Sequence, residues 1–98
     1  MDAFVADDEV VHGDGVLVVS GEIDMACVDD VLARGLSLLA HPQVRGLVID
    51  LAQVSFIDSS GLSVLVRLHH AARASSKQVA LRHPSRIVAR LLQLTALD

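Results

Sequence analysis

The chain has very little cysteine and few aromatic residues. Cys27 is the only cysteine among 98 residues, so no internal disulfide and no cysteine-rich metal site can form, and a reducing compartment suits the chain. Phe4 and Phe56 are the only aromatic residues, which leaves no stacking platform for single-stranded bases or sugars. These shortages argue against a disulfide scaffold and against ligands held by ring stacking.

The sequence also lacks an excess of positive charge. Its formal net charge is −4, and the eight Lys and Arg residues are scattered along the chain, so nucleic acid is a poor candidate partner. No apolar run approaches the length of a membrane span, and residues 1–4 lack the basic start of a signal peptide. We therefore expect a cytoplasmic protein that binds neither nucleic acid nor a membrane.

Recognisable catalytic and metal-binding patterns are missing as well. The Gly-x-Ser-x-Gly elbow of a serine hydrolase is absent, and no glycine and lysine loop for a nucleotide occurs. His69 and His70 are adjacent and point roughly 100° apart on a helix, so they do not readily share a metal. Cys27, which falls in a helix predicted over residues 25–40, is interpreted as a core residue. We expect no catalytic residues, no metal and no cofactor.

Short apolar runs predict a single α/β domain over residues 1–98, with a hydrophobic content of 52% that is ample for a core. Residues 9–12 and 16–19 read as a hairpin around Gly13-Asp14-Gly15. Residues 25–40 read as a helix that Asp24 caps, and residues 46–51 as a central strand buried on both faces.

The second half of the chain continues this alternation. A second helix follows the serine pair at residues 59–60, residues 78–82 form a short strand, and Pro84-Ser85 opens a last helix whose apolar face includes Leu91, Leu92 and Leu94. The order ββαβαβα predicts a mixed sheet, in which crossover helices join parallel strands and the hairpin is antiparallel.

Residues 58–62, with the sequence DSSGL, combine the end of a buried strand, a polar turn and the start of a helix. The first N–H groups of a helix have no internal partner and carry partial positive charge, so a serine there can cap the helix or hold a phosphate. The local residues alone favour the cap and leave both interpretations open.

Three longer motifs point to a family: GEID at residues 21–24, LVIDL at 47–51 and FIDSSGLSVL at 56–65. Together they resemble a STAS domain of the anti-anti-sigma factor type, also called an anti-sigma factor antagonist. The resemblance runs from about residue 9 to Thr95-Ala96-Leu97. Family members often continue into a further strand and helix, so the chain is expected to be either shortened at its C-terminus or a compact member.

The resemblance implies a partner switch without enzymatic activity of its own. The unmodified protein would bind a serine kinase that is also an anti-sigma factor, and thereby free a sigma factor. Phosphorylation of Ser59, the first serine after the aspartate, would end this binding, and a serine phosphatase would reset it. ATP and magnesium would belong to the kinase.

The same resemblance outlines a partner-binding surface around Ser59. Asp24 and Asp58 each end a strand that feeds a helix, so we expect their charges to add to the repulsion exerted by a phosphate. Gly61 is expected to let a partner's backbone approach, and Met25 and Leu62 to supply apolar contact. The full predicted partner-binding set is Glu22, Asp24, Met25, Asp58, Ser60, Gly61 and Leu62.

Two other interpretations stay open at this level. A STAS module can serve a stressosome-like assembly, a lipid-transport complex or the cytoplasmic tail of a transporter. A nucleotide-binding regulatory domain belongs to a different class, and saturable GTP or ATP binding by the purified chain would reveal it.

Overall fold

The computed structural model of the chain describes the backbone of residues 4–94 and the side chains of residues 9–90. Its elements follow the predicted order ββαβαβα. They are β1 (Phe4–Val11), β2 (Asp14–Ile23), α1 (Val28–Ala40), β3 (Gly46–Ile57), α2 (Ser59–Ala74), β4 (Gln78–Arg82) and α3 (Arg86–Leu94). The predicted apolar side chains of Leu91, Leu92 and Leu94, and the segment Thr95-Ala96-Leu97, lie outside the described residues.

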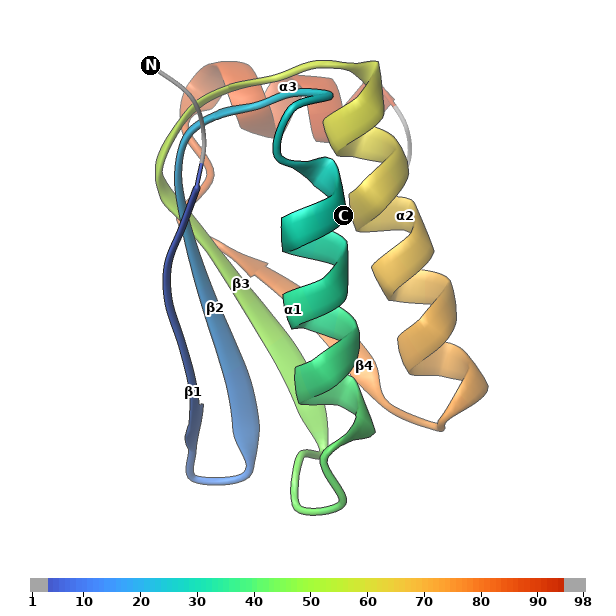
Figure 1. Cartoon of the computed structure of the whole chain (residues 1–98). Helices are drawn as coiled ribbons and strands as arrows, with labels where there is room; N and C mark the ends of the chain where they lie inside the picture. Colours follow the sequence, from blue (N-terminus) through green and yellow to red (C-terminus); the bar gives the residue numbers. More distant parts are fainter. Residues whose placement is uncertain (1–3, 95–98) are drawn as a thin grey trace.

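The strands form one mixed sheet in the order β1-β2-β3-β4. β1 pairs with β2 antiparallel, whereas β2 with β3 and β3 with β4 are parallel pairs, which confirms the predicted sheet. The helices α1 and α2 lie side by side over one face of the sheet, and α3 lies at the end where β2 and β3 finish (Figure 1). Parallel neighbours require such crossover helices because the end of one strand and the start of the next lie at opposite ends of the sheet.

The hairpin turn lies earlier than the glycine pattern predicted. β1 ends at Val11 and β2 begins at Asp14, so His12 and Gly13 form a two-residue turn. Their φ angles are 52° and 87°, the left-handed conformation that twisted two-residue hairpins require at both positions. Gly15, which was expected in the turn, is instead a buried residue of β2.

The first helix also begins later than predicted, at Val28. Its N-cap is Cys27, whose side chain makes no capping hydrogen bond, so the prediction that Asp24 caps this helix is wrong. The Asp24 carboxylate instead accepts the N–H of Ala26 at 3.0 Å, which forms a local turn before the helix. Such a turn competes with helix for the same backbone groups, and it therefore delays the start of the helix.

The central strand β3 is longer than predicted, and only one of its faces is fully buried. Leu47, Ile49 and Leu51 face α1 and α2 and are at most 1% exposed. On the opposite face Val48 and Asp50 are only half-buried, because that face is open around them and forms a surface hollow near Val48. Each fully buried aliphatic side chain contributes about 1.5–3 kcal/mol, so the helix-covered face carries most of the core.

The second and third helices begin as the sequence predicts. α2 starts at Ser59, and α3 starts directly after Ser85, whose hydroxyl accepts the N–H of Val88 at 3.2 Å. Val88 is completely buried and packs into the same core as the sheet. The predicted strand at residues 78–82 is confirmed with the same bounds.

Candidate functional site

The predicted site forms where two parallel strands end next to each other. Ile23 of β2 and Ile57 of β3 are register partners, and Asp24 and Asp58 follow them directly. The N–H of Asp58 donates to the carbonyl of Ile23 at 3.2 Å, which ties the two connecting segments together. Figure 1 shows that both segments leave the same end of the sheet, toward α1 and α2. The carboxyl ends of parallel strands thus collect the site residues.

Asp58 caps the second helix, a role that the local sequence had left to a serine. Its side-chain oxygen Oδ1 accepts the N–H of Gly61 at 3.0 Å, and its carbonyl accepts the N–H of Leu62 at 3.0 Å. Its extended backbone, with φ −91° and ψ −174°, is the geometry of an N-cap residue. The capping explanation for the serine pair is therefore wrong, because the preceding aspartate performs that function.

Ser59 occupies the first position of α2 and is exposed, whereas Ser60 is half-buried. Because Asp58 supplies the cap, the Ser59 hydroxyl is not committed to the helix terminus. The two serines are neighbours in the chain but differ in access to solvent. Ser59 is the serine that another protein can reach more easily.

Gly61 is buried against the chain's own strands. A Cβ atom at this position would lie 2.7 Å from the carbonyl oxygen of Ile23 and 2.7 Å from Cγ2 of Ile57. Such distances are far inside van der Waals contact, so only glycine lets the first turn of α2 sit on the ends of β2 and β3. The close backbone approach expected at Gly61 is made within the chain, and contact with a partner there stays a prediction.

The other predicted partner residues differ in how much surface they offer. Glu22 is exposed, and Met25 is 76% exposed at the tip of the segment between β2 and α1. Asp24 is half-buried, and Leu62 is half-buried and packs against the hydrophobic core. Met25 is therefore the larger apolar contact surface of the pair, whereas Leu62 is partly a core residue.

Phe56 lies beside the predicted set, and sequence reasoning missed it. It is the register partner of Glu22 and is 45% exposed, although it is one of two aromatic residues in the chain. The register between β2 and β3 shifts between Gly21 and Glu22, and this irregularity places Val54 and Ile57 inside while Ser55 and Phe56 face outward. A strict alternation of inward and outward residues does not reveal such a bulge.

The electrostatics of the site are acidic. Burial raises the pKa of the Cys27 thiol, and the negative charges of Asp24 and Asp58 raise that pKa further, while hydrogen bonding to the Asp24 carbonyl lowers it. The Cys27 sulfur lies 3.5 Å from that carbonyl oxygen. A buried thiol with a raised pKa is a poor nucleophile at neutral pH, which agrees with a packing role for Cys27.

Three further features bear on the class of protein. Within the described residues no three histidine, cysteine or carboxylate side chains gather in a way that could hold a metal ion. The rings of His69 and His70 have centroids 5.8 Å apart and meet at 63°. None of the helices between residues 4 and 94 has the length and hydropathy needed to cross a membrane.

The four-stranded mixed sheet, with two helices on one face and an exposed serine where a parallel strand turns into a helix, defines a small α/β domain. The STAS domain family model matches residues 6–98. The chain therefore belongs to the STAS domain family.

Solved structures agree with this assignment. An anti-sigma factor antagonist from Mycobacterium paratuberculosis is 30% identical, with a TM-score of 0.82, and the match covers 99% of this chain and 80% of that one. The Bacillus cell fate determinant SpoIIAA in its phosphorylated form shares the fold at 23% identity, with a TM-score of 0.76 and coverage of 93% and 83%. A sulfate transporter family protein from Wolinella succinogenes does so at 16% identity, with a TM-score of 0.77 and coverage of 91% and 71%.

Proposed function

We propose that this chain is an anti-sigma factor antagonist that works as a phosphorylation switch in the cytoplasm. In its unphosphorylated form it binds an anti-sigma factor that is also a serine kinase, and this binding frees a sigma factor. Phosphorylation of Ser59 by the kinase abolishes the binding, and a serine phosphatase restores it. The chain is a passive substrate, while ATP and magnesium are held by the kinase.

The observation that carries this proposal is the uncommitted hydroxyl of Ser59. It is exposed at the first position of α2, and the capping bond that would otherwise engage a serine is made by Asp58. A kinase needs such a hydroxyl to be accessible, and the half-buried Ser60 is the poorer acceptor. The 30% identity to an anti-sigma factor antagonist supports the assignment of partner class.

Added charge explains why modification would end binding. A phosphate contributes about −1.5 to −2 charges, here next to Asp58 and at the strand ends that Asp58 and Asp24 follow. The Gly61 N–H, one of the donors a phosphate could otherwise use, is already bonded to Asp58. The phosphate would therefore add to an acidic field at the contact surface, and a loss of about 1.4 kcal/mol lowers affinity tenfold.

The test is phosphorylation of the purified chain by candidate anti-sigma factor kinases with ATP and magnesium, followed by mass spectrometry. We expect phosphate on Ser59 in the wild type and in Ser60→Ala, and none in Ser59→Ala. Ser60→Ala is the matched control, since it removes the neighbouring hydroxyl and leaves Asp58 in place. Label on Ser60 alone would overturn the site assignment.

Binding measurements test the switch separately from the chemistry. Ser59→Ala should bind the kinase with wild-type affinity and stay bound when ATP is added, while Ser59→Asp should bind at least about tenfold more weakly. Glu22, Met25, Leu62 and the other predicted partner residues form the proposed contact surface. Equal affinities for wild type, Ser59→Ala and Ser59→Asp would sink the mechanism.

A second candidate is a STAS module of a different regulatory system. The structural match to a sulfate transporter family protein favours it, because it shows that the same fold occurs in another setting. In that case candidate anti-sigma factor kinases would neither bind the chain nor label Ser59. The two candidates are therefore separated by the phosphorylation experiment.

A further inference from the structure

A β-bulge near the end of the sheet turns Phe56 toward the surface. Between Val54 and Phe56, β3 contains one residue more than the facing part of β2. The β2 partners of these two residues, Gly21 and Glu22, are adjacent in the chain. Gly21 has a φ angle of 84°, a left-handed conformation that glycine adopts without steric cost. Bulges re-aim side chains, and they are over-represented next to functional sites.

The bulge exchanges the environments of two neighbouring apolar residues. Regular alternation from the buried Val54 would place Phe56 in the core and Ile57 at the surface. Instead Ile57 is 1% exposed and Phe56 is 45% exposed. The chain has no tryptophan or tyrosine, so the fold leaves one of its only two phenyl rings partly in water. This arrangement forgoes the stabilisation that full burial of the ring would supply.

Phe56 lies on a part of β3 whose position β2 determines. The pairing of β3 with β4 extends only as far as Asp50, six residues earlier. The exposed Glu22 is the register partner of Phe56, and Met25, which is 76% exposed, follows Glu22 by three residues. Figure 1 shows the segments that follow β2 and β3 at the same end of the sheet. The ring therefore belongs to the end of the sheet that carries the serine turn.

A partner that binds stably around Ser59 covers Phe56 as well. Three residues separate the two positions, so their Cα atoms are at most about 11 Å apart. A standard interface buries about 800 Å² of each partner, which corresponds to a disc with a radius of about 16 Å. Phe56 therefore falls inside an interface of that size centred on Ser59. The occupant of this surface is then the kinase that modifies Ser59.

We propose that Phe56 is the apolar anchor through which the anti-sigma factor kinase holds the unphosphorylated chain. The anchor role rests on the proposed function, and it adds a contact residue outside the set expected from the sequence. The phenyl ring fills an apolar pocket of the kinase, with Met25 at the border of the contact. A phosphate on Ser59 would lie beside this contact, where exclusion of water makes an unpaired charge costly.

The test is titration of the unphosphorylated chain with the kinase that labels Ser59. We expect Phe56→Ala to bind at least about tenfold more weakly than the wild type, and Phe56→Leu, which keeps an apolar side chain, to lose less. In the phosphorylation reaction, Phe56→Ala should raise KM at least about tenfold and change kcat less, because the ring contacts the kinase and not the transferred phosphoryl group. Urea midpoints show whether each variant is folded, and Phe56→Leu provides the test if Phe56→Ala unfolds.

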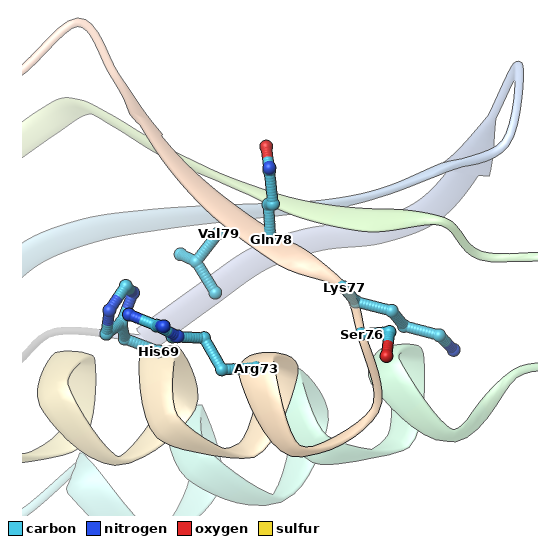
Figure 2. A pocket seen from close by; sticks show the side chains of 6 residues that line it. All are labelled: His69, Arg73, Ser76, Lys77, Gln78 and Val79. Carbon is cyan, nitrogen blue, oxygen red and sulfur yellow. The ribbon is translucent and has the colours of Figure 1, made fainter.

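Two variants far from the serine turn serve as controls. Val10 is an apolar residue with 41% exposure, and it pairs with Gly15 beside the hairpin turn, at the other end of the sheet. Arg73 follows Ser59 by fourteen residues of α2, or about 21 Å along the helix, and it lines a surface hollow beside β4 (Figure 2). Val10→Ala and Arg73→Ala lie outside an interface of about 16 Å radius, so each should bind the kinase like the wild type.

The possible results separate the anchor from the proposed function. If the kinase labels Ser59 and binds folded Phe56→Ala within about twofold of the wild type, the anchor is refuted and the phosphorylation switch stands. A loss of affinity in Val10→Ala or Arg73→Ala as large as that in Phe56→Ala would refute the anchor too, because the effect would not be local to the ring. If no candidate kinase binds or labels the wild-type chain, the proposed function fails and the anchor fails with it.

Discussion

The side-chain oxygen Oδ1 of Asp58 accepts the backbone N–H of Gly61 at 3.0 Å. This bond closes the first turn of α2, and it leaves the hydroxyl of Ser59, between the two residues, exposed to solvent. An aspartate and a glycine three residues apart thus hold the helix start in place without using the serine that they flank. Asp58 and Gly61 thus stabilise the turn, while the hydroxyl of Ser59 stays accessible.

Loss of the Asp58 cap should destabilise the chain measurably. Asp58→Ala is expected to lower the free energy of unfolding by about 1 kcal/mol, because the Gly61 N–H loses its partner. Asp58→Asn keeps an acceptor oxygen and should cost only a fraction of that. Urea denaturation followed by circular dichroism measures both variants, and an unchanged midpoint for Asp58→Ala would show that the bond contributes nothing.

Gly61→Ala is expected to destabilise the chain by about 1–3 kcal/mol, the usual cost of overpacking. The added Cβ would lie 2.7 Å from the backbone oxygen of Ile23, which cannot move without disturbing β2. Helix propensity alone predicts the opposite sign, a gain of about 1 kcal/mol from replacing glycine by alanine. Ser63→Ala, at an exposed position of the same helix, is the control. Stabilisation by Gly61→Ala would refute the close packing.

Ser20 is a buried residue whose hydroxyl oxygen has no hydrogen-bond partner in the described structure. A buried hydroxyl without a partner costs about 1–3 kcal/mol, so its removal relieves a penalty. Ser20→Ala should therefore leave the free energy of unfolding unchanged or raise it by up to about 1 kcal/mol. Chemical denaturation tests this directly. A clear loss of stability would mean that the hydroxyl has a bonding partner after all.

Stability should decline in acid through Asp50. The N–H of Ala52 at 2.9 Å and the guanidinium of Arg82 at 3.0 Å hold the pKa of this carboxyl below its ordinary value of 3.8. Because the folded state lowers this pKa, the stabilisation is present above the ordinary value and is lost as pH falls through the folded value. We expect Asp50→Asn to be less stable than wild type near neutrality and to lose less stability below about pH 4.

Urea denaturation at several values from about pH 6 to about pH 3 measures this difference. Asp29→Asn, which removes an exposed carboxylate from the first turn of α1, should retain the acid sensitivity of the wild type. Parallel acid profiles for wild type and Asp50→Asn would show that the interactions of Asp50 with Ala52 and Arg82 do not govern this response.

Element order, sheet type and the place of the serine turn were all predictable from the sequence. Apolar runs of strand length alternate with segments whose apolar residues recur at helical spacing. Both patterns depend only on residues close together in the chain. For the same reason the bounds of β4 and the start of α2 were predicted correctly. The start of α1 and the position of the hairpin turn were not predicted correctly. The chain at Asp24 and at His12 has more than one possible local conformation, and small energy differences decide between them.

By itself the sequence determined that Asp58, Ser59 and Gly61 meet at one turn before a helix, since chain connectivity alone brings them together. Only the tertiary structure decided which of them caps the helix and which is buried against Ile23. Those outcomes depend on how α2 sits on the ends of β2 and β3, a contact between residues almost forty positions apart that local patterns do not encode. The exposure of Ser59 is therefore a property of the fold, whereas its position in the turn is a property of the sequence.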